Sequence, residues 1–370
     1  MKGFMKCALA LLLILTPAAA LAESGGSYED EGVYTMVDLS GQTVMSMAGR
    51  IYAGDEYISS DNRLYRVLEV DDAARRAVAQ YLGAEPDVDR EAVRAVFAHA
   101  EDSGKSEHKK LVAMYSTHSD ESYEKGDGAA SLDQGGGIYD VDRALKEQLE
   151  KLGIEVELDT TTHLPHDAKA YSRSRRTAEE LMKLGPDALL DIHRDGIPDK
   201  TEYETEVDGE ETSKVRLLVG RSNPNASANR EFAKQVKAVA DEKYEGLVKD
   251  IFIGKGDYNQ GLYPQALLLE FGTHTTDKAD AIDATKYMAD VLNTVLYGDT
   301  ARAEGLTDGG AGRSILWLLV VIALGGLIYA LIATGTLKNL GAKFSSGASE
   351  LTGGLLGRRE EDDHPDGEDY

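Results

Sequence analysis

Histidine and carboxylate side chains gather at three places in the sequence, and each place follows or ends a short apolar run. His118 and Glu121 follow the first run, His193 follows the second, and Glu270 comes directly after the third. The runs, which are typical of buried strands, are Leu111–Tyr115, Ala188–Ile192 and Ala266–Leu269. If the three strands are parallel, their carboxyl ends lie at one edge of a sheet, where functional groups collect. We therefore expect these four side chains to form one site.

These residue types are the ones that a catalytic zinc site requires. The only cysteine, Cys7, lies in the expected signal segment, so any metal must be held by nitrogen and oxygen. Zinc binds imidazole and carboxylate, and catalytic sites combine three protein ligands with a water molecule whose pKa falls to about 7. We assign His118, Glu121 and His193 as the zinc ligands, with Asp140 as the alternative to Glu121.

A further carboxylate must take the proton of that water and pass it to the leaving nitrogen. Glu270 is assigned to this role, because a buried carboxylate at the end of an apolar strand would be costly without one. Arg194 and Asn259 are candidates for substrate binding. His274, four residues after Glu270, either contacts substrate or belongs to a loop.

Strand and helix patterns alternate from Lys110 onward, which predicts an α/β fold with a mainly parallel sheet flanked by helices. Further strands are expected at Ile154–Leu158, Arg216–Val219 and Ile251–Ile253. Apolar residues at helical spacing predict helices near 141–152, 168–184, 232–239 and 282–295. This α/β domain is expected to span residues 111–297.

Residues 23–100 read as a small β-rich domain. Frequent turn residues separate five expected strands, which are Val33–Leu39, Thr43–Met47, Arg50–Ala53, Glu56–Ile58 and Leu64–Val70. Helices are expected near Asp72–Leu82 and Arg90–His99, followed by a polar linker at 101–110.

The two ends of the sequence indicate secretion and membrane attachment. Residues 1–22 combine a basic start, a short apolar run and Ala20-Leu21-Ala22, which is typical of a cleavable signal peptide. Residues 315–334 carry no charge and are long enough for a transmembrane helix, which follows a Gly-rich spacer at 298–314. The expected location is the cell membrane, with residues 23–314 outside and the acidic-ended tail 335–370 in the cytoplasm.

The charge balance excludes one class of partner. The formal net charge is −25, whereas nucleic acid is bound through clustered lysine and arginine. We expect no nucleic-acid partner.

At five motifs the sequence resembles the stage II sporulation protein P family. The motifs are Thr117-His118-Ser119-Asp120-Glu121-Ser122-Tyr123, Asp191-Ile192-His193-Arg194-Asp195, Asn223-Pro224-Asn225, Tyr258-Asn259-Gln260 and Leu269-Glu270. The resemblance implies a zinc-dependent N-acetylmuramoyl-L-alanine amidase that acts on peptidoglycan, with a second endopeptidase activity on peptide cross-links. It also implies action during engulfment, beside stage II sporulation proteins D and M.

The family's motif histidines fall on His118 and His193, and its motif glutamates on Glu121 and Glu270. The resemblance extends from about residue 30 to about 297. One departure is the expected membrane helix at the carboxyl end, because relatives usually carry an anchor near the amino end. Two other functions remain open: a non-catalytic scaffold that binds peptidoglycan, and a zinc peptidase that acts on proteins.

Overall fold

The computed structural model describes residues 32–85, 109–133, 135–167 and 169–298 of the chain. All of them belong to the first of two compact units, Met1–Asp299. The expected signal peptide, the helix near Arg90–His99, most of the linker and spacer, the transmembrane helix and the tail lie outside the described residues. Among the helices of the described ranges, none is long and apolar enough to cross a membrane.

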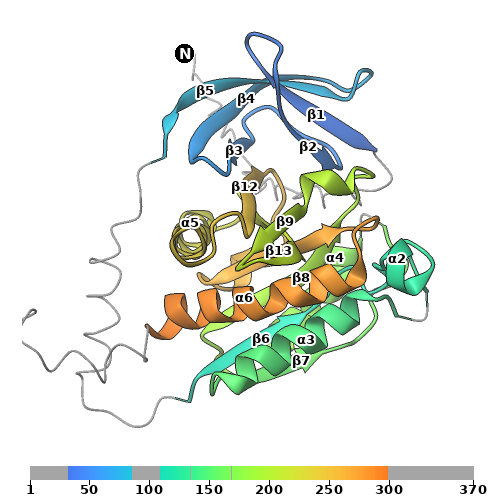
Figure 1. Ribbon diagram of the computed structural model, residues 1–370, viewed down its shortest axis with the longest axis vertical. Helices are drawn as coiled ribbons and strands as arrows, with labels where there is room; N and C mark the ends of the chain where they lie inside the picture. Colours follow the sequence, from blue (N-terminus) through green and yellow to red (C-terminus); the bar gives the residue numbers. More distant parts are fainter. Residues whose placement is uncertain (1–31, 86–108, 134, 168, 299–370) are drawn as a thin grey trace, which may run out of the picture. The chain divides into compact units, whose positions relative to one another are not determined.

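Eleven strands form one continuous sheet (Figure 1). In sheet order they are β2 (Thr43–Ala48), β1 (Val33–Asp38), β5 (Arg76–Ala84), β4 (Arg63–Asp71), β3 (Glu56–Ile58), β12 (Val248–Gly254), β11 (Val215–Gly220), β13 (Ala266–Thr273), β8 (Ala188–Asp195), β6 (Leu111–Tyr115) and β7 (Glu155–Asp159). Two further strands, β9 (Glu204–Val207) and β10 (Glu210–Ser213), pair with each other in a separate small sheet.

The direction of the strands is mixed. β7, β6, β8 and β13 are parallel, as expected for the strands that carry the candidate site. β11 runs antiparallel to β13, and β3 runs antiparallel to β12. The prediction of a mainly parallel sheet concerns residues 111–297, where four of the five strand pairings within this sheet are parallel. With the amino-terminal strands included, the sheet as a whole is mixed. The connection 255–265 between β12 and β13 is shorter than the dozen or more residues that a parallel crossover needs, so β13 runs opposite to β12.

The amino-terminal strands continue the same sheet, because β3 pairs with both β4 and β12. The helix predicted near Asp72–Leu82 is wrong, since β4 and β5 form an antiparallel hairpin there. Its turn is closed by Arg75, which has a positive φ of 49° and donates its backbone N–H to Asp72. The alanine-rich turn has helical propensity. In the folded chain, however, Tyr65 pairs with Tyr81 and Val67 pairs with Ala79, and this strand pairing outweighs the local propensity. Residues 50–53, predicted as a strand, have no strand structure.

Helices cover both faces of the carboxyl-terminal part of the sheet. The helices are α2 (Glu124–Asp127), α3 (Ile138–Lys151), α4 (Ala170–Met182), α5 (Ala226–Lys243) and α6 (Lys278–Tyr297), with short 3-10 turns η2 (Lys200–Glu202) and η3 (Gln260–Leu262). Apolar residues of α3, α5 and α6 pack on one face in a single cluster. On the other face α4 packs on β6 and β8, and the amino-terminal strands pack on Leu218 and Leu268.

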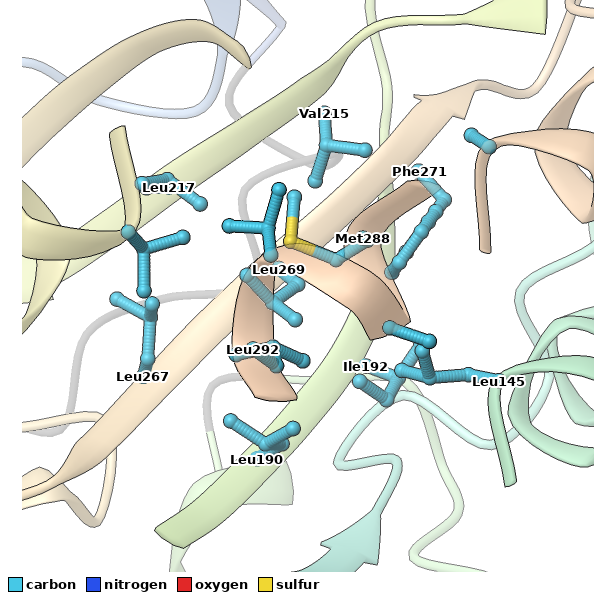
Figure 2. Close-up of a cluster of buried hydrophobic side chains, with 14 of the residues drawn as sticks. Leu145, Leu190, Ile192, Val215, Leu217, Leu267, Leu269, Phe271, Met288 and Leu292 are labelled. Atoms are coloured by element: carbon cyan, nitrogen blue, oxygen red, sulfur yellow. The ribbon is translucent and has the colours of Figure 1, made fainter. Parts of the chain in front are cut away.

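Figure 2 shows the centre of the larger cluster, where Met288 and Leu292 of α6 lie among leucines from β8, β11 and β13. Both side chains are fully buried. Truncation of such a residue to alanine costs about 2–5 kcal/mol, because the surrounding core does not close the cavity. This packing fixes the strands whose ends carry the candidate site.

One buried acid in this layer makes the stability depend on pH. Asp142 of α3 is fully buried, accepts a hydrogen bond from Ser116 Oγ at 2.9 Å, and has no partner for Oδ1 among the described residues. Burial raises the pKa of Asp142 to about 8 from its ordinary 3.8. The folded state therefore binds more protons than the unfolded state between these values, and this group lowers stability as pH rises, by up to about 1.4 kcal/mol per pH unit.

We predict that Asp142→Asn stabilises the protein more at pH 8 than at pH 5.5. The amide is neutral at both values, so the cost of ionising the buried acid disappears. Urea unfolding of the variant and the original chain at the two pH values, with chelator present, measures the difference. A difference between the two proteins that is the same at both pH values would contradict the assignment.

Candidate metal centre

The side chains that the sequence predicts to form the site lie together at one edge of the sheet. β6, β8 and β13 are parallel neighbours, so their carboxyl ends coincide. His193 of β8 lies opposite Glu270 of β13 in the strand register. His118 and Glu121 belong to the loop that follows β6. The four side chains His118, Glu121, His193 and Glu270 thus line one pocket where the strand ends meet.

His118, Glu121 and His193 form a buried cluster that could hold a metal ion. Glu121 Oε1 lies 3.0 Å from His118 Nδ1 and 3.2 Å from His193 Nδ1. Ligand atoms of a tetrahedral zinc site, each about 2.0–2.1 Å from the ion, lie roughly 3.3 Å apart. The donor types and these distances therefore fit a zinc ion held by two imidazoles and one carboxylate.

The loop after β6 places two ligands on one side through a tight turn. The backbone N–H of Glu121 donates to the carbonyl of His118 at 3.1 Å. Gly136 packs directly against this turn, and a Cβ atom there would lie 1.9 Å from the carbonyl oxygen of Glu121. The backbone of Arg194 donates to Glu121 Oε2 at 2.9 Å, which leaves Oε1 facing the two imidazoles. Gly136 was not singled out in the sequence, although the Gly135–Gly137 run marks the close approach.

The electrostatics of the cluster favour an ionised carboxylate. Burial alone would raise the pKa of Glu121, but the charge of His193 and hydrogen bonds with both histidines hold that pKa well below its ordinary value. Burial lowers the pKa of His118. For His193 burial also acts to lower the pKa, but Asp191 and Glu121 outweigh it and raise the pKa well above its ordinary value. A metal ion that binds here competes with a proton on His193.

Glu270 lines the same pocket and is the neighbour of His193 in the register of β13 and β8. The pocket has about 340 Å³ of empty space, including space open to solvent, and is lined by the three cluster residues, Glu270 and Tyr171 among others. Burial and the nearby carboxylate of Asp195 raise the pKa of Glu270 to about 8. The hydroxyl of Tyr203 lies 3.3 Å from Glu270 Oε2. Glu270 therefore lines the pocket together with the cluster but is not one of its three residues.

A buried arginine supports this side of the pocket. Arg216 of β11 donates to Asp195 at 2.7 Å and binds Asp250 with two hydrogen bonds of 2.7 and 3.0 Å. Asp195 also accepts hydrogen bonds from Tyr203 and from the backbone of Ala48 in β2. All these groups are buried, and removal of one partner of such a network costs about 3–5 kcal/mol. The sequence signal for this network is an arginine inside an otherwise apolar strand.

The residues predicted to bind substrate, Arg194, Asn259 and His274, make hydrogen bonds within the protein. The guanidinium of Arg194 is buried and donates to the backbone carbonyls of Ser122 and Ala130. Asn259 is buried and donates to the carbonyl of Tyr171 and to Ser174 Oγ. The backbone of His274 donates to the carbonyl of Asp195, and its Nδ1 lies 3.3 Å from Thr273 Oγ1.

Two histidines that the sequence left without a role have distinct positions. His163 is buried, with its ring nitrogens 2.9 Å from the carbonyl of Ser116 and 2.9 Å from Thr177 Oγ1, so it holds the loop. His166 lines the pocket, and its ring stacks on His118 with 3.9 Å between ring centres. Its Nδ1 lies 3.1 Å from Asp120 Oδ1.

The fold and the site define the class of protein: a mixed α/β protein with a buried His–Glu–His cluster that could bind a metal. The model of the family described as stage II sporulation protein P matches residues 48–293. The chain belongs to this family, as the motifs indicated. The stage II sporulation protein P of Bacillus subtilis (strain 168) is 27% identical over an alignment of 215 residues, which covers 53% of each protein. The chain thus spans about half the length of this relative.

Two solved structures illustrate the comparison of folds. The CwlD amidase from Clostridioides difficile, in complex with the GerS lipoprotein, has a TM-score of 0.36 at 13% identity, covering 52% of this chain and 100% of that one. An N-acetylmuramoyl-L-alanine amidase from Clostridium difficile 630 has a TM-score of 0.33 at 15% identity, covering 55% of this chain and 100% of that one.

The structure separates the two candidates for the third ligand. Asp140 is 38% exposed in its side chain and pairs with Arg143 and Lys278, whereas Glu121 lies between the imidazoles. We predict that Glu121→Ala lowers zinc affinity by more than the 10–100-fold that follows loss of an outer partner. Asp140→Asn should retain the affinity of the original chain.

Competition with a chromophoric chelator measures both zinc affinities, and far-ultraviolet circular dichroism confirms that each variant is folded. The opposite ranking, with Asp140→Asn the weaker binder, would make Asp140 the ligand.

Proposed function

We propose that the chain is a zinc-dependent peptidoglycan hydrolase that cleaves the N-acetylmuramoyl-L-alanine amide. The observation that carries this proposal is the meeting of His118, Glu121 and His193 in one buried cluster with Glu270 across the same pocket. Membership of the stage II sporulation protein P family supports cell wall as the substrate. Cleavage of peptide cross-links is proposed as a second activity, because it requires the same groups.

Each side chain of the site has a separate role in the proposed reaction. A zinc ion bound by the cluster would act as a Lewis acid and lower the pKa of a bound water to about 7. Glu121 and the two histidines serve as ligands, held by the backbone N–H of Arg194 and by the turn after β6. In its ionised form, Glu270 would accept a proton from the attacking water and deliver it to the departing nitrogen. Tyr203 and Arg216 keep the carboxylate of Glu270 in place from the far side.

The proposed location and partners follow from the sequence and the family. We propose that residues 23–314 act outside the cell membrane, tethered by the apolar segment 315–334. Stage II sporulation proteins D and M are proposed as partners during engulfment, as the family resemblance implies.

The products released from purified peptidoglycan test the reaction. Mass spectrometry should find stem peptides with a free amino-terminal alanine, formed with zinc and not with a chelator. Binding to peptidoglycan without release of products would favour the scaffold, and cleavage of polypeptide but not of muropeptides would favour a protein peptidase. Either result would overturn the proposal.

We predict that Glu270→Gln binds zinc as the original chain does but loses about 10²–10⁴-fold in turnover, the usual contribution of a positioned acid–base group. Glu202→Gln is the matched control, because Glu202 pairs with Lys249 and does not line the pocket. Zinc affinity and the rate of muropeptide release are measured on the same preparations. Near-normal turnover by Glu270→Gln would remove Glu270 from the mechanism.

A further inference from the structure

A second carboxylate lies behind the metal cluster, on the side away from Glu121. Asp191 of β8 is buried and stands two residues before His193, so both side chains project from the same face of the strand. Asp191 Oδ1 lies 2.9 Å from His193 Nε2. The other ring nitrogen of His193, Nδ1, is the one that faces Glu121. Asp191 thus contacts the imidazole at the nitrogen that is not available to the metal.

Donors from the loop after β6 surround the same carboxylate. The backbone N–H of Thr117 donates to Asp191 Oδ1 at 2.8 Å, and its hydroxyl donates to Oδ2 at 2.6 Å. Asp191 therefore contacts Thr117 and the ring of His193 at the same time, and its contact at Nε2 leaves Nδ1 as the ring nitrogen that faces the cluster.

A chain of buried hydrogen bonds continues from Thr117 to α4 and to the loop before η3. Ser174 Oγ of α4 lies 2.8 Å from Thr117 Oγ1, and Asn259 Nδ2 donates to Ser174 Oγ at 3.0 Å. Because the hydroxyl hydrogen of Thr117 is used toward Asp191, Ser174 is the donor to Thr117. Every member of this chain is buried, and each hydroxyl has a donor and an acceptor role filled. The buried position of Asn259, predicted in the sequence as substrate-binding, has its reason here.

The two ligand histidines differ in whether a carboxylate contacts the Nε2 atom of the ring. His118 Nε2 is buried and has no hydrogen-bond partner among the described residues, so no carboxylate fixes its ring from behind. Thr117, however, directly precedes His118. Asp191 therefore orients the ring of His193 and, through Thr117, also holds the backbone from which His118 projects.

We propose that Asp191 is a positioning residue of the metal centre, which fixes the ring orientation of His193 and is itself held by Thr117, Ser174 and Asn259. The inference rests on the proposed metal centre and adds a carboxylate to it. Loss of a carboxylate that holds a ligand histidine usually lowers metal affinity 10–100-fold. A purely structural tie between β6 and β8 would change stability and leave metal affinity as it is.

The test uses the purified full-length chain with Zn²⁺ and Co²⁺ as the only probes. We expect Asp191→Asn to lower Zn²⁺ affinity about 10–100-fold, measured by competition with a chromophoric chelator, and to change the visible absorption spectrum of bound Co²⁺. The matched control is Asp142→Asn. Asp142 is also a buried aspartate, but its hydrogen bond comes from Ser116, the residue before Thr117, and it does not line the pocket. This variant should keep both the affinity and the spectrum.

A pair of variants at the next link distinguishes positioning from folding. Thr117→Val removes the hydroxyl that binds Asp191 and should lower Zn²⁺ affinity about tenfold, as expected for one hydrogen bond to a charged group. Thr117→Ser keeps the hydroxyl and should restore the affinity. Circular dichroism and urea unfolding of the metal-free proteins confirm that each variant folds.

Failure of the metal centre and failure of the positioning role of Asp191 give different results. If the original chain binds no zinc, the metal centre itself is wrong, and the proposed function fails with it. If the original chain binds zinc and Asp191→Asn matches Asp142→Asn in affinity and in Co²⁺ spectrum, the metal centre stands and the positioning role of Asp191 is overturned.

Discussion

The carboxylate of Glu121 lies buried between the imidazoles of His118 and His193, and the rest of the site is arranged around this contact. An ionised carboxylate away from water is unfavourable unless hydrogen bonds or opposite charges surround it. Here the backbone N–H of Arg194 and the two ring nitrogens supply those partners. The cluster joins two chain segments and Glu270 adds a third, and all three must be fixed to within a fraction of an ångström, which a rigid scaffold provides. The parallel strands β6, β8 and β13 provide it.

The amino-terminal strands also contribute to the pocket. Ala48 of β2 lines it and donates its backbone N–H to Asp195, and Arg216 reaches the carbonyl of Ser46 in the same strand. The sheet is continuous from β2 to β7. Glu270 thus stands between two supports: the metal cluster on one side, and the Asp195–Arg216 network with its β2 contacts on the other. A change in the amino-terminal strands would therefore reach the candidate base through hydrogen bonds.

The sequence predicted the site well where chemistry and strand ends coincide. Apolar runs followed by His118, His193 and Glu270 have a direct physical meaning, because parallel strands end at one edge. The reversed direction of β11 and β12 could not be read from their apolar patterns, since a buried strand has the same pattern in either direction. The helix expected at Asp72–Leu82 failed because local alanines favour a helix, while the pairing of β4 with β5 depends on residues elsewhere in the chain.

Buried polar partners were the least predictable part of the site. Arg194 and Asn259 have side chains that could bind a peptide, yet the fold turns both inward onto backbone carbonyls and a serine hydroxyl. Asp191 and Thr117 were visible in the motifs, but their contact joins two strands and exists only after folding. Such contacts depend on which strands become neighbours in the sheet, and the order of the strands cannot be predicted from a single sequence.

Anomalous X-ray diffraction at the zinc absorption edge, from crystals of the zinc-loaded protein, tests the central claim most directly. The account predicts one anomalous peak within about 2.0–2.2 Å of His118, His193 and Glu121. A zinc ion bound elsewhere, or one held by only one of the two imidazoles, would contradict it.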